Sequence, residues 1–597
     1  MILSRRVWLG LALCGALAGV GLIVLSAAGY ALGWNQTGGL RHGSNLVPFS
    51  LFAGICSLLL AGAVILMRAP EILPGTHGLC AILLLAILSF GFAGLYVKHV
   101  KPLILLPVDI AMGSESQFVD QIIRYRVGQP QYTPADDANS TAYAPGAPVV
   151  TYWIASLLGR STSIATYRAI QQLFILLAVL LTAAAALLLL RNIQPENSHA
   201  NLWLLFWVPF LYLMATNPYT NVYTHVLYSD GLGLAANSIA MWLLFKHLAS
   251  QDDRWLIPMA LIPALGFLAK QKEAIWLGLY VLYFLLAGRI PLRRIMVFAV
   301  SGAVLLGLAT GMCYALWGAP FWFWNFQVLS RIHVFLSRIL AQVQYSSLFL
   351  LPGLIGGGLL LRGEGMKRLF PAWTCWLVQV LVSIYTSGIA FRPAHLGAAT
   401  MFGAVWFLAG LATLWPAKQE MSLPENRATS WWLAAMVPLA LFLFMLRCDL
   451  LRRGPAVPEG FHLYVATIEK EFAGLPREKV LLDSGSWVYL STNTVMKDRE
   501  SPLGTLWGSG ASDYQATLDR FRDHYYARIL ARKEMFFYRD DRIRTALLQY
   551  YEEVRTIPSP GVPIAGWYYA AQLSEVAVLE PQKSPAPGLN APPAGKH

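Results

Sequence analysis

Charged side chains are scarce along most of this sequence. Only 13% of its 597 residues are Asp, Glu, Lys or Arg, whereas 56% are hydrophobic. Soluble domains carry about 25% charged residues, and a single hydrophobic core stops growing at about 250–300 residues. Charged residues become frequent only after about residue 446. The composition therefore excludes an ordinary soluble protein and predicts an integral membrane protein with a water-soluble part at its C-terminal end.

Cysteine is also rare, and no pair of cysteines has the CxxC spacing or a histidine at the spacing of a metal ligand. The sequence therefore has no sign of a zinc site built on cysteine, and the cysteines within apolar runs are interpreted as packing residues. The net charge of +13 is spread over short loops between apolar runs, as in membrane proteins, so we expect no nucleic-acid partner. The cysteines are Cys14, Cys56, Cys80, Cys313, Cys375 and Cys448.

Long apolar runs follow one another from the N-terminus to about residue 447. A spanning helix needs about 20 apolar residues, and about 13 runs approach this length. The first run follows Arg5 and Arg6 and exceeds the apolar part of a signal peptide, about 7–15 residues, so we interpret it as a spanning helix. The predicted spans lie near 7–31, 49–67, 78–97, 166–190, 201–216, 230–248, 255–270, 273–288, 294–317, 346–361, 370–390, 396–415 and 430–447.

Lys and Arg gather in alternate loops between these runs. Such loops are typically cytoplasmic, which places the N-terminus inside. An odd number of spans then places the C-terminal domain outside. The residues concerned are Arg5, Arg6, Arg68, Arg191, Lys246, Arg254, Arg289, Arg293, Arg294, Arg362, Lys367, Arg368, Lys418 and Arg427.

The remaining loops are then expected on the non-cytoplasmic face. The longest is 98–165, in which Phe118, Ile122 and Tyr125 fall on one face of an amphipathic helix. A second apolar stretch, Val149 to Leu158, returns toward the membrane. Long ordered loops usually carry function. The other outer segments are Asn217–Asp230, 318–345, Thr386–His395 and the turn Lys270–Lys272.

The chain is thus predicted to be a membrane α-helical bundle with a C-terminal soluble α/β domain. The transmembrane domain covers 1–447 and includes the outer loop 98–165, the α/β domain covers 448–580, and 581–597 is a Pro-, Ala- and Gly-rich tail with the composition of a disordered segment. Within the α/β domain we expect strands at 479–483, from 527 and at 576–579, and a helix at 513–526.

Two carboxylates of the outer loop are candidate catalytic groups. Asp109 and Glu115 follow a predicted span closely, and ionised carboxylates near a membrane are usually kept for a purpose. Either could act as a general base toward an acceptor hydroxyl. The structural alternative is that they are solvated loop charges or helix caps.

Basic residues on the outer face run against the positive-inside bias. Recognition of a phosphate is one reason for their presence, and snorkelling of long side chains toward lipid headgroups is the alternative. Asp230, at the outer end of a span, either caps a helix or binds sugar hydroxyls or a cation. The basic residues are Lys270, Lys272, Arg331, His333, Arg338, Arg392 and His395, with snorkelling favoured for Arg338.

Several stretches, in this order along the chain, resemble the GT-C superfamily of integral membrane glycosyltransferases. The outer loop has an acidic motif, an amphipathic helix and two turns, and later segments have an acidic helix start and a "K-Q" turn. The chain departs from the pattern in the spacing of its acidic motif, in Ala144 and in a second span before the loop. The stretches are Asp109, Glu115, Gly128-Gln-Pro-Gln-Tyr132, Tyr143-Ala-Pro145-Gly146, Leu157-Leu-Gly159, Tyr228-Ser-Asp230-Gly and Gly266-Phe-Leu-Ala-Lys270-Gln271.

This resemblance is to protein O-mannosyltransferases, the aminoarabinose transferase of lipid A and mycobacterial arabinofuranosyltransferases. It implies a bacterial inner-membrane enzyme that transfers a sugar, with inversion, from a polyprenyl-phosphate donor to a hydroxyl of a glycan, lipid or protein. Glu115 or Asp109 would be the base. Some members bind a divalent cation, which this sequence leaves open. Donor-phosphate binding falls to Lys270, Lys272, Arg331 and Arg392, and substrate binding to Tyr132, Tyr143, His225, Asp230, His333 and His395.

Two other functions stay open at this point. A transporter or flippase of a lipid-linked precursor would place ionisable residues within its spans, where this chain has few. An O-antigen ligase or polymerase would act on the same face through a later loop. Arg331, His333 and Arg392 lie in later outer segments and leave that function open.

Overall fold

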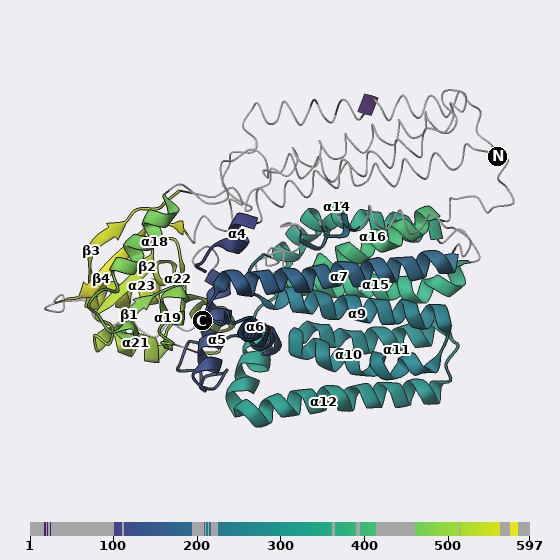
Figure 1. Ribbon diagram of the computed structural model, residues 1–597, viewed down its shortest axis with the longest axis horizontal. Helices are drawn as coiled ribbons and strands as arrows, with labels where there is room; N and C mark the ends of the chain where they lie inside the picture. Colours follow the sequence, from purple (N-terminus) through teal and green to yellow (C-terminus); the bar gives the residue numbers. More distant parts are fainter. Residues whose placement is uncertain are drawn as a thin grey trace.

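The computed structural model of the chain is largely helical, with one four-stranded sheet near the C-terminal end (Figure 1). The predicted spans at 7–31, 49–67, 78–97 and 430–447 and the tail lie outside the described residues, apart from a few single positions. The structure describes residues 101–109, 113–193, 210–212, 214–216, 225–360, 365–389, 395–412, 460–512, 514–561 and 573–582, and the isolated positions Leu17, Ala18, Gly21, Val24 and Val208.

In the described part of the chain, 4 helical segments are long and apolar enough to cross a membrane. They coincide with predicted spans and confirm a helical membrane domain. They are α7 (Ile164–Ile193), α9 (Ser229–Ser250), the helical segment Leu292–Arg331, which contains α12 (Leu292–Trp322) and is kinked at Gly318, and Arg368–Gly388 of α15 (Gly365–Ile389).

Other predicted spans form helices that are shorter or less apolar. Because a straight spanning helix needs about 20 residues, the predicted total of about 13 spans stays a prediction. These helices are α10 (Leu256–Ala269), α11 (Trp276–Ala287), α14 (Leu336–Leu360) and α16 (Gly397–Ala412). The short helices η2 (Asp253–Trp255) and η3 (Gln271–Ile275) precede α10 and α11.

Small residues let the helices of the bundle approach closely. Gly356 of α14 and Gly410 of α16 face each other, and a methyl group on either would meet the backbone of the other helix. Packing of small residues replaces the hydrophobic driving force that lipid removes. One buried apolar cluster runs through α7, α9, α10, α11, α14, α15 and α16.

The two ends of the bundle differ in the residues they carry. At one end, Arg294 pairs with Asp253 at 2.5 Å, and Arg368 donates to the backbone of Leu248. At the other end, η3 contacts the outer loop, where Gln271 donates to the carbonyl of Ala142 at 2.9 Å. The basic loops thus gather away from the predicted outer segments, as alternation along the chain requires, and their cytoplasmic orientation stays a prediction.

The outer loop folds into helices between the bundle and the C-terminal domain (Figure 1). These are α4 (Lys101–Leu105), α5 (Gly113–Arg126) and α6 (Gly146–Leu157). The predicted helix is present as α5, but residues 115–124 are all buried, polar and apolar alike. The helix is therefore enclosed between the bundle and the C-terminal domain and does not lie at the membrane surface with one polar face exposed. Figure 1 shows α6 end-on while the long bundle helices lie in the plane of view, so α6 crosses the direction of the bundle.

The C-terminal domain is built on a sheet with strand order β1-β2-β4-β3. Strands β1 and β2 are parallel, and β4 pairs antiparallel with β2 and β3. The predicted strands and helix are confirmed, whereas β3 was not foreseen. The elements are α18 (Phe461–Lys470), η7 (Arg477–Lys479), β1 (Val480–Leu482), α19 (Trp487–Leu490), α20 (Glu500–Ser509), α21 (Gln515–Arg522), β2 (Arg528–Arg532), α22 (Phe536–Arg539), α23 (Asp541–Tyr550), β3 (Tyr551–Ile557) and β4 (Val576–Pro581).

The outer loop and the C-terminal domain share one hydrophobic core. Phe118 and Tyr132 of the loop belong to the same buried cluster as Leu482 and Trp487 of the domain. The helix α13 (Val328–Arg331), which ends the helical segment Leu292–Arg331, also packs against α20. The domain is therefore packed onto the end of the bundle that carries the outer loop.

Candidate functional site

Glu115, in the first turn of α5, is fully buried against the membrane domain. Its carboxylate pairs with Arg168 of α7 at 2.5 Å and accepts from the backbone N–H of Leu227 at 2.8 Å. Arg168 also donates to the backbone carbonyls of the segment that precedes α5. Burial raises the pKa of Glu115 above its ordinary value, although the charge of Arg168 opposes the shift.

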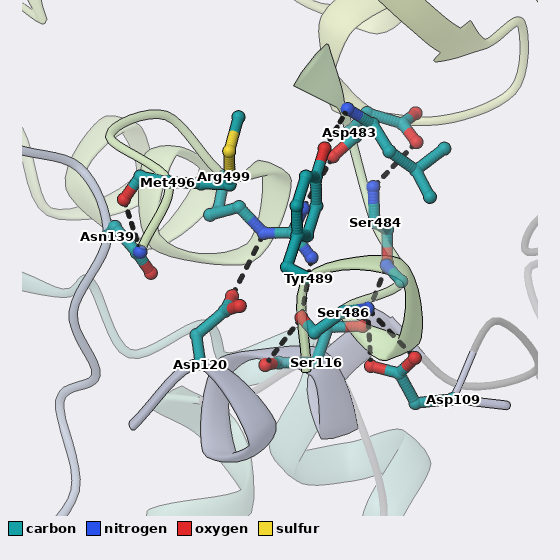
Figure 2. Close-up of polar contacts among 12 residues, drawn as sticks. Asp109, Ser116, Asp120, Asn139, Asp483, Ser484, Ser486, Tyr489, Met496 and Arg499 are labelled. Carbon is teal, nitrogen blue, oxygen red and sulfur yellow. Dashed lines mark hydrogen bonds and ion pairs between the residues drawn. The ribbon is translucent and has the colours of Figure 1, made fainter. Parts of the chain in front are cut away.

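Asp109 is also fully buried, but it faces the C-terminal domain (Figure 2). Both of its oxygens accept from the backbone N–H of Ser486 at 2.8 Å, and one accepts from that of Trp487 at 3.0 Å. The two carboxylates predicted as alternatives for one role therefore lie in different surroundings.

Lys270 and Asp230 form a buried ion pair with an N–O distance of 2.9 Å. Lys270 ends α10, and Asp230 lies in the first turn of α9. Both side chains are nearly inaccessible, and such a pair resists separation because a lone buried charge is costly. The other oxygen of Asp230 is buried and finds no hydrogen-bond partner among the described residues.

Lys272 lies beside this pair in η3 and donates to the backbone carbonyl of His395 at 3.0 Å. Lys272, Lys270, Asp230, Glu273 and His395 line a small cavity with a volume of about 10 Å³, room for about one water molecule. The cavity also reaches Leu234, Asn237, Gly397 and Ala398. Four residues that the sequence singled out separately thus meet at one place.

The segment His225–Asp230 links the two parts of the site. The backbone N–H of Leu227 donates to Glu115, and the side chain of Asp230 pairs with Lys270. The α-carbons of Leu227 and Asp230 cannot be more than about 11 Å apart, because three residues of chain reach no further. The candidate base and the candidate phosphate-binding lysines therefore belong to one region.

Aromatic residues of the outer loop support this region. Tyr143 and Tyr228 contact each other through their hydroxyls, and Phe118 packs against both rings. Tyr132 is buried and donates to the carbonyl of Tyr143 at 2.7 Å. The hydroxyl of Tyr132 thus serves the packing of the loop, and its predicted contact with substrate stays untested.

An apolar groove of about 750 Å³ lies on the other side of η3, between α10 and α11 on one side and α12 with the π-helical turn η4 (Phe323–Gln327) on the other. Small residues on α12 open it, and aromatic rings form its walls. Gln271 stands at its polar end and donates to the side-chain oxygen of Asn325 at 2.6 Å. The groove is lined by Phe267, Gln271, Ala274, Leu277, Ala303, Leu306, Gly307, Thr310, Gly311, Tyr314, Trp322 and Phe326.

The remaining predicted site residues are less closely connected to this region. Arg331 and His333 are exposed, and within the described part of the chain no hydrogen bond or ion pair joins either to the lysines. Arg392 lies outside the described residues. Burial lowers the pKa of His225 to about 4, so the ring is neutral at pH 7.

Sequence reasoning missed two arginines that hold the site. Arg168 is fully buried beside Glu115 in α7, and an ionisable residue within a predicted span is a functional candidate by default, so a signal was present. Arg499 of the C-terminal domain pairs with Asp120 of α5 at 2.9 Å. Nothing in the local sequence around Arg499 marks it.

The described residues contain no group of three or more His, Cys, Asp and Glu side chains that could hold a metal ion. Asp109 accepts from the C-terminal domain and Glu115 pairs with Arg168 of the bundle, so the two carboxylates do not converge on one cation in this arrangement.

No family model matches the chain, and no curated protein does. Among solved structures, the chain is similar to ArnT from Cupriavidus metallidurans bound to undecaprenyl phosphate, with a TM-score of 0.46 and 12% identity over 84% of this chain and 97% of that chain. The apo state of the same protein gives 0.44 and 11% with the same coverage. At such low values the likeness assigns neither a fold nor a function to this chain, whose own residues must carry both.

Proposed function

We propose that the chain is a membrane glycosyltransferase that takes a sugar from a polyprenyl-phosphate donor. The observation that carries this proposal is the position of η3, which has a charged cavity on one side and an apolar groove on the other. A polyprenyl phosphate has the same two parts, an anionic head and a long apolar chain. The donor class itself comes from the sequence resemblance.

In the proposed reaction, an acceptor hydroxyl attacks the anomeric carbon of the donor from the face opposite the phosphate. A bond forms between that oxygen and the carbon, and the bond from the carbon to the phosphate oxygen breaks. Glu115 takes the hydroxyl proton. A carboxyl group with a raised pKa is the better base, because proton transfer is most efficient when the pKa lies near the working pH. Polyprenyl phosphate leaves with the electron pair and inversion results.

Lys270 and Lys272 are assigned to the leaving phosphate. Positive charge placed where negative charge develops lowers the barrier most in a site shielded from water. Both lysines line the charged cavity, and Lys272 has no buried carboxylate at close hydrogen-bonding distance, since Glu273 is 3.8 Å away. Lys272 is therefore the better placed of the two to meet an incoming phosphate, for which the cavity, with room for about one water molecule, must open. We assign the reaction to the non-cytoplasmic face on the charge bias of the loops.

Lys272→Gln tests the phosphate site. Gln can still donate to the carbonyl of His395 but carries no charge. We expect affinity for undecaprenyl phosphate to fall about tenfold, the loss of one charge-assisted contact worth about 1.4 kcal/mol. Affinity for the uncharged undecaprenol should stay within about twofold of wild type. Fluorescence titration of the purified protein in detergent measures both.

Equal weakening for both lipids would show that the substitution damages the groove and not a phosphate contact. A second assay decides between transfer and transport. Proteoliposomes that move the lipid-linked sugar across the bilayer and form no glycosidic bond would overturn the proposed function in favour of a flippase.

Gly307→Leu tests the groove. A Cβ at this position of α12 meets no heavy atom, so the larger side chain can enter the groove without displacing the backbone. We expect the KM for a long-chain donor to rise about tenfold, because leucine displaces lipid contact worth about two methylene groups at about 0.8 kcal/mol each. The KM for a soluble donor with a short prenyl chain should stay unchanged.

Gly358→Leu on α14 is the matched control, because its Cβ also meets no atom and it does not line the groove. If both substitutions raise the KM for the long-chain donor equally, the groove is not where the prenyl chain binds.

A further inference from the structure

The sequence made Asp109 and Glu115 equal candidates for the general base. In the structure, Asp109 contacts the C-terminal domain and Glu115 contacts the membrane domain. We propose that Asp109 is a positioning residue that fastens the outer loop to the C-terminal domain, and that the domain thereby holds Glu115 in place. The inference rests on the proposed function only for the role of Glu115. The docking itself can be tested without any transfer assay.

Asp109 reaches into the loop that follows β1 of the C-terminal domain. Its two oxygens accept from the backbone N–H groups of Ser486 and Trp487, where α19 begins. Backbone N–H groups at such a position have no partner in their own turn. Asp109 therefore caps a segment that lies 377 residues further along the chain. This contact exists only while the outer loop and the C-terminal domain stay docked.

Two further residues, Ser116 and Asp120, fasten the same stretch to the domain beyond Glu115. The hydroxyl of Ser116 accepts from the backbone N–H of Gly485 at 2.8 Å, and its carbonyl accepts from Ser486. Arg499 pairs with Asp120 and also donates to Ser486 and to the carbonyl of Leu482. Figure 2 shows Asp109, Ser116 and Asp120 all directed toward the domain.

The helix α5 is held from two sides as a result. Ser116 and Asp120 are four residues apart and share the helix face that meets the C-terminal domain. Glu115 points instead to Arg168 and Leu227 of the membrane domain. The domain thus clamps the segment 109–120 at both ends, and Glu115 lies in the middle of it. A shift of about 1 Å in a catalytic group can cost about 100-fold in rate, so a clamp of this kind bears directly on catalysis.

The interface is complementary in charge. The loop contributes the carboxylates of Asp109 and Asp120, and the domain contributes the guanidinium of Arg499 and two backbone N–H groups. All three side chains are buried, so a group that loses its partner here is left away from bulk water. Removing one group should therefore loosen the contact and not merely rearrange it.

The test compares Asp109→Asn with Asp109→Ala in the full-length protein in detergent. Asn caps backbone N–H groups nearly as well as Asp, whereas Ala does not. We expect hydrogen exchange of the Ser486 and Trp487 amides to rise about tenfold or more in Asp109→Ala and less than about threefold in Asp109→Asn. Asp136→Ala, at an exposed position of the same loop, should leave both amides unchanged.

The transfer kinetics of the same two variants provide a second test. We expect Asp109→Ala to lower kcat about tenfold or more with an unchanged donor KM, and Asp109→Asn to recover most of the rate. If Asn loses the rate as completely as Ala while the amides stay protected, Asp109 takes part in the chemistry and the proposal is overturned. Unchanged exchange in Asp109→Ala overturns it as well.

Ser116→Ala covers the case in which Asp109→Ala does not fold. It removes the acceptor of the Gly485 N–H and leaves both carboxylates in place. We expect faster exchange of the Gly485 amide by about threefold or more, and no change there would contradict the clamp. Because exchange is measured without substrate, the clamp can stand even if the protein transfers no sugar.

Discussion

Glu115→Gln should lower kcat for sugar transfer by about 10²–10⁴-fold, the usual contribution of a positioned general base. Gln keeps the size of the side chain and an oxygen that can accept from Arg168 and from the N–H of Leu227. Donor binding should change little, because the lysines and the groove are untouched. Single-turnover transfer from a radiolabelled lipid-linked sugar measures the loss.

The control is Glu534→Gln, which makes the same chemical change at an exposed position of the C-terminal domain and should keep the wild-type rate. A thermal unfolding curve shows whether Glu115→Gln is folded. A folded variant with the full rate would remove Glu115 from the mechanism.

The pH dependence of the rate offers a further check on Glu115. A base must be ionised, so kcat should fall as the pH is lowered through the pKa of Glu115 in the folded protein. Burial raises that pKa above the ordinary 4.5, so the acid limb of the profile should lie above pH 4.5. An acid limb below that pH would contradict the assignment.

Arg168→Met should destabilise the protein by about 3–5 kcal/mol, because it leaves a buried carboxylate without its partner. It also removes the donors to the carbonyls of Leu103, Leu106 and Val108. Loss of the Arg168 charge raises the pKa of Glu115 in the folded variant further. The variant should therefore lose stability as the pH rises through that pKa and regain it as the pH falls. Thermal unfolding in detergent at several pH values measures both effects.

Arg191→Met, at an exposed position of the same helix, is the matched control and should stay within about 0.5 kcal/mol of wild type. The double variant with Glu115→Gln should recover part of the loss, since the uncompensated charge is gone. Equal unfolding temperatures for Arg168→Met and wild type would mean that the pair contributes nothing to the fold.

Patterns that act over a few turns were readable in the sequence. The spacing of Phe118, Ile122 and Tyr125 predicted α5, and the apolar runs predicted α7, α9, the long helix from Leu292 and α15. The strand ending at Asp483 was also visible. These features depend on the alternation of apolar and polar residues, which is a property of the local chain.

Partners that lie far apart in the chain were not readable. Asp230 and Lys270 each stood out, but nothing local shows that they pair. The groove needs α12 to lie opposite α10 and α11, and nothing in the sequence around Gly307 shows which helices lie opposite it. Similarly, β3 has exposed residues along most of its length. It therefore lacks the alternation of apolar and polar residues from which a strand could have been predicted.

By itself, the sequence determined that this protein is a membrane protein and which residues form its long helices, and it singled out an acidic outer loop and a "K-Q" turn as candidates for its chemistry. Composition and periodicity suffice for this, because the apolar and polar residues of each helix must match the lipid, protein or water that they contact. Only the tertiary structure decided that Asp109 and Glu115 face different domains. A carboxylate takes its role from the donors that surround it, and here those donors, Ser486 and Arg168, come from parts of the chain that only folding brings together.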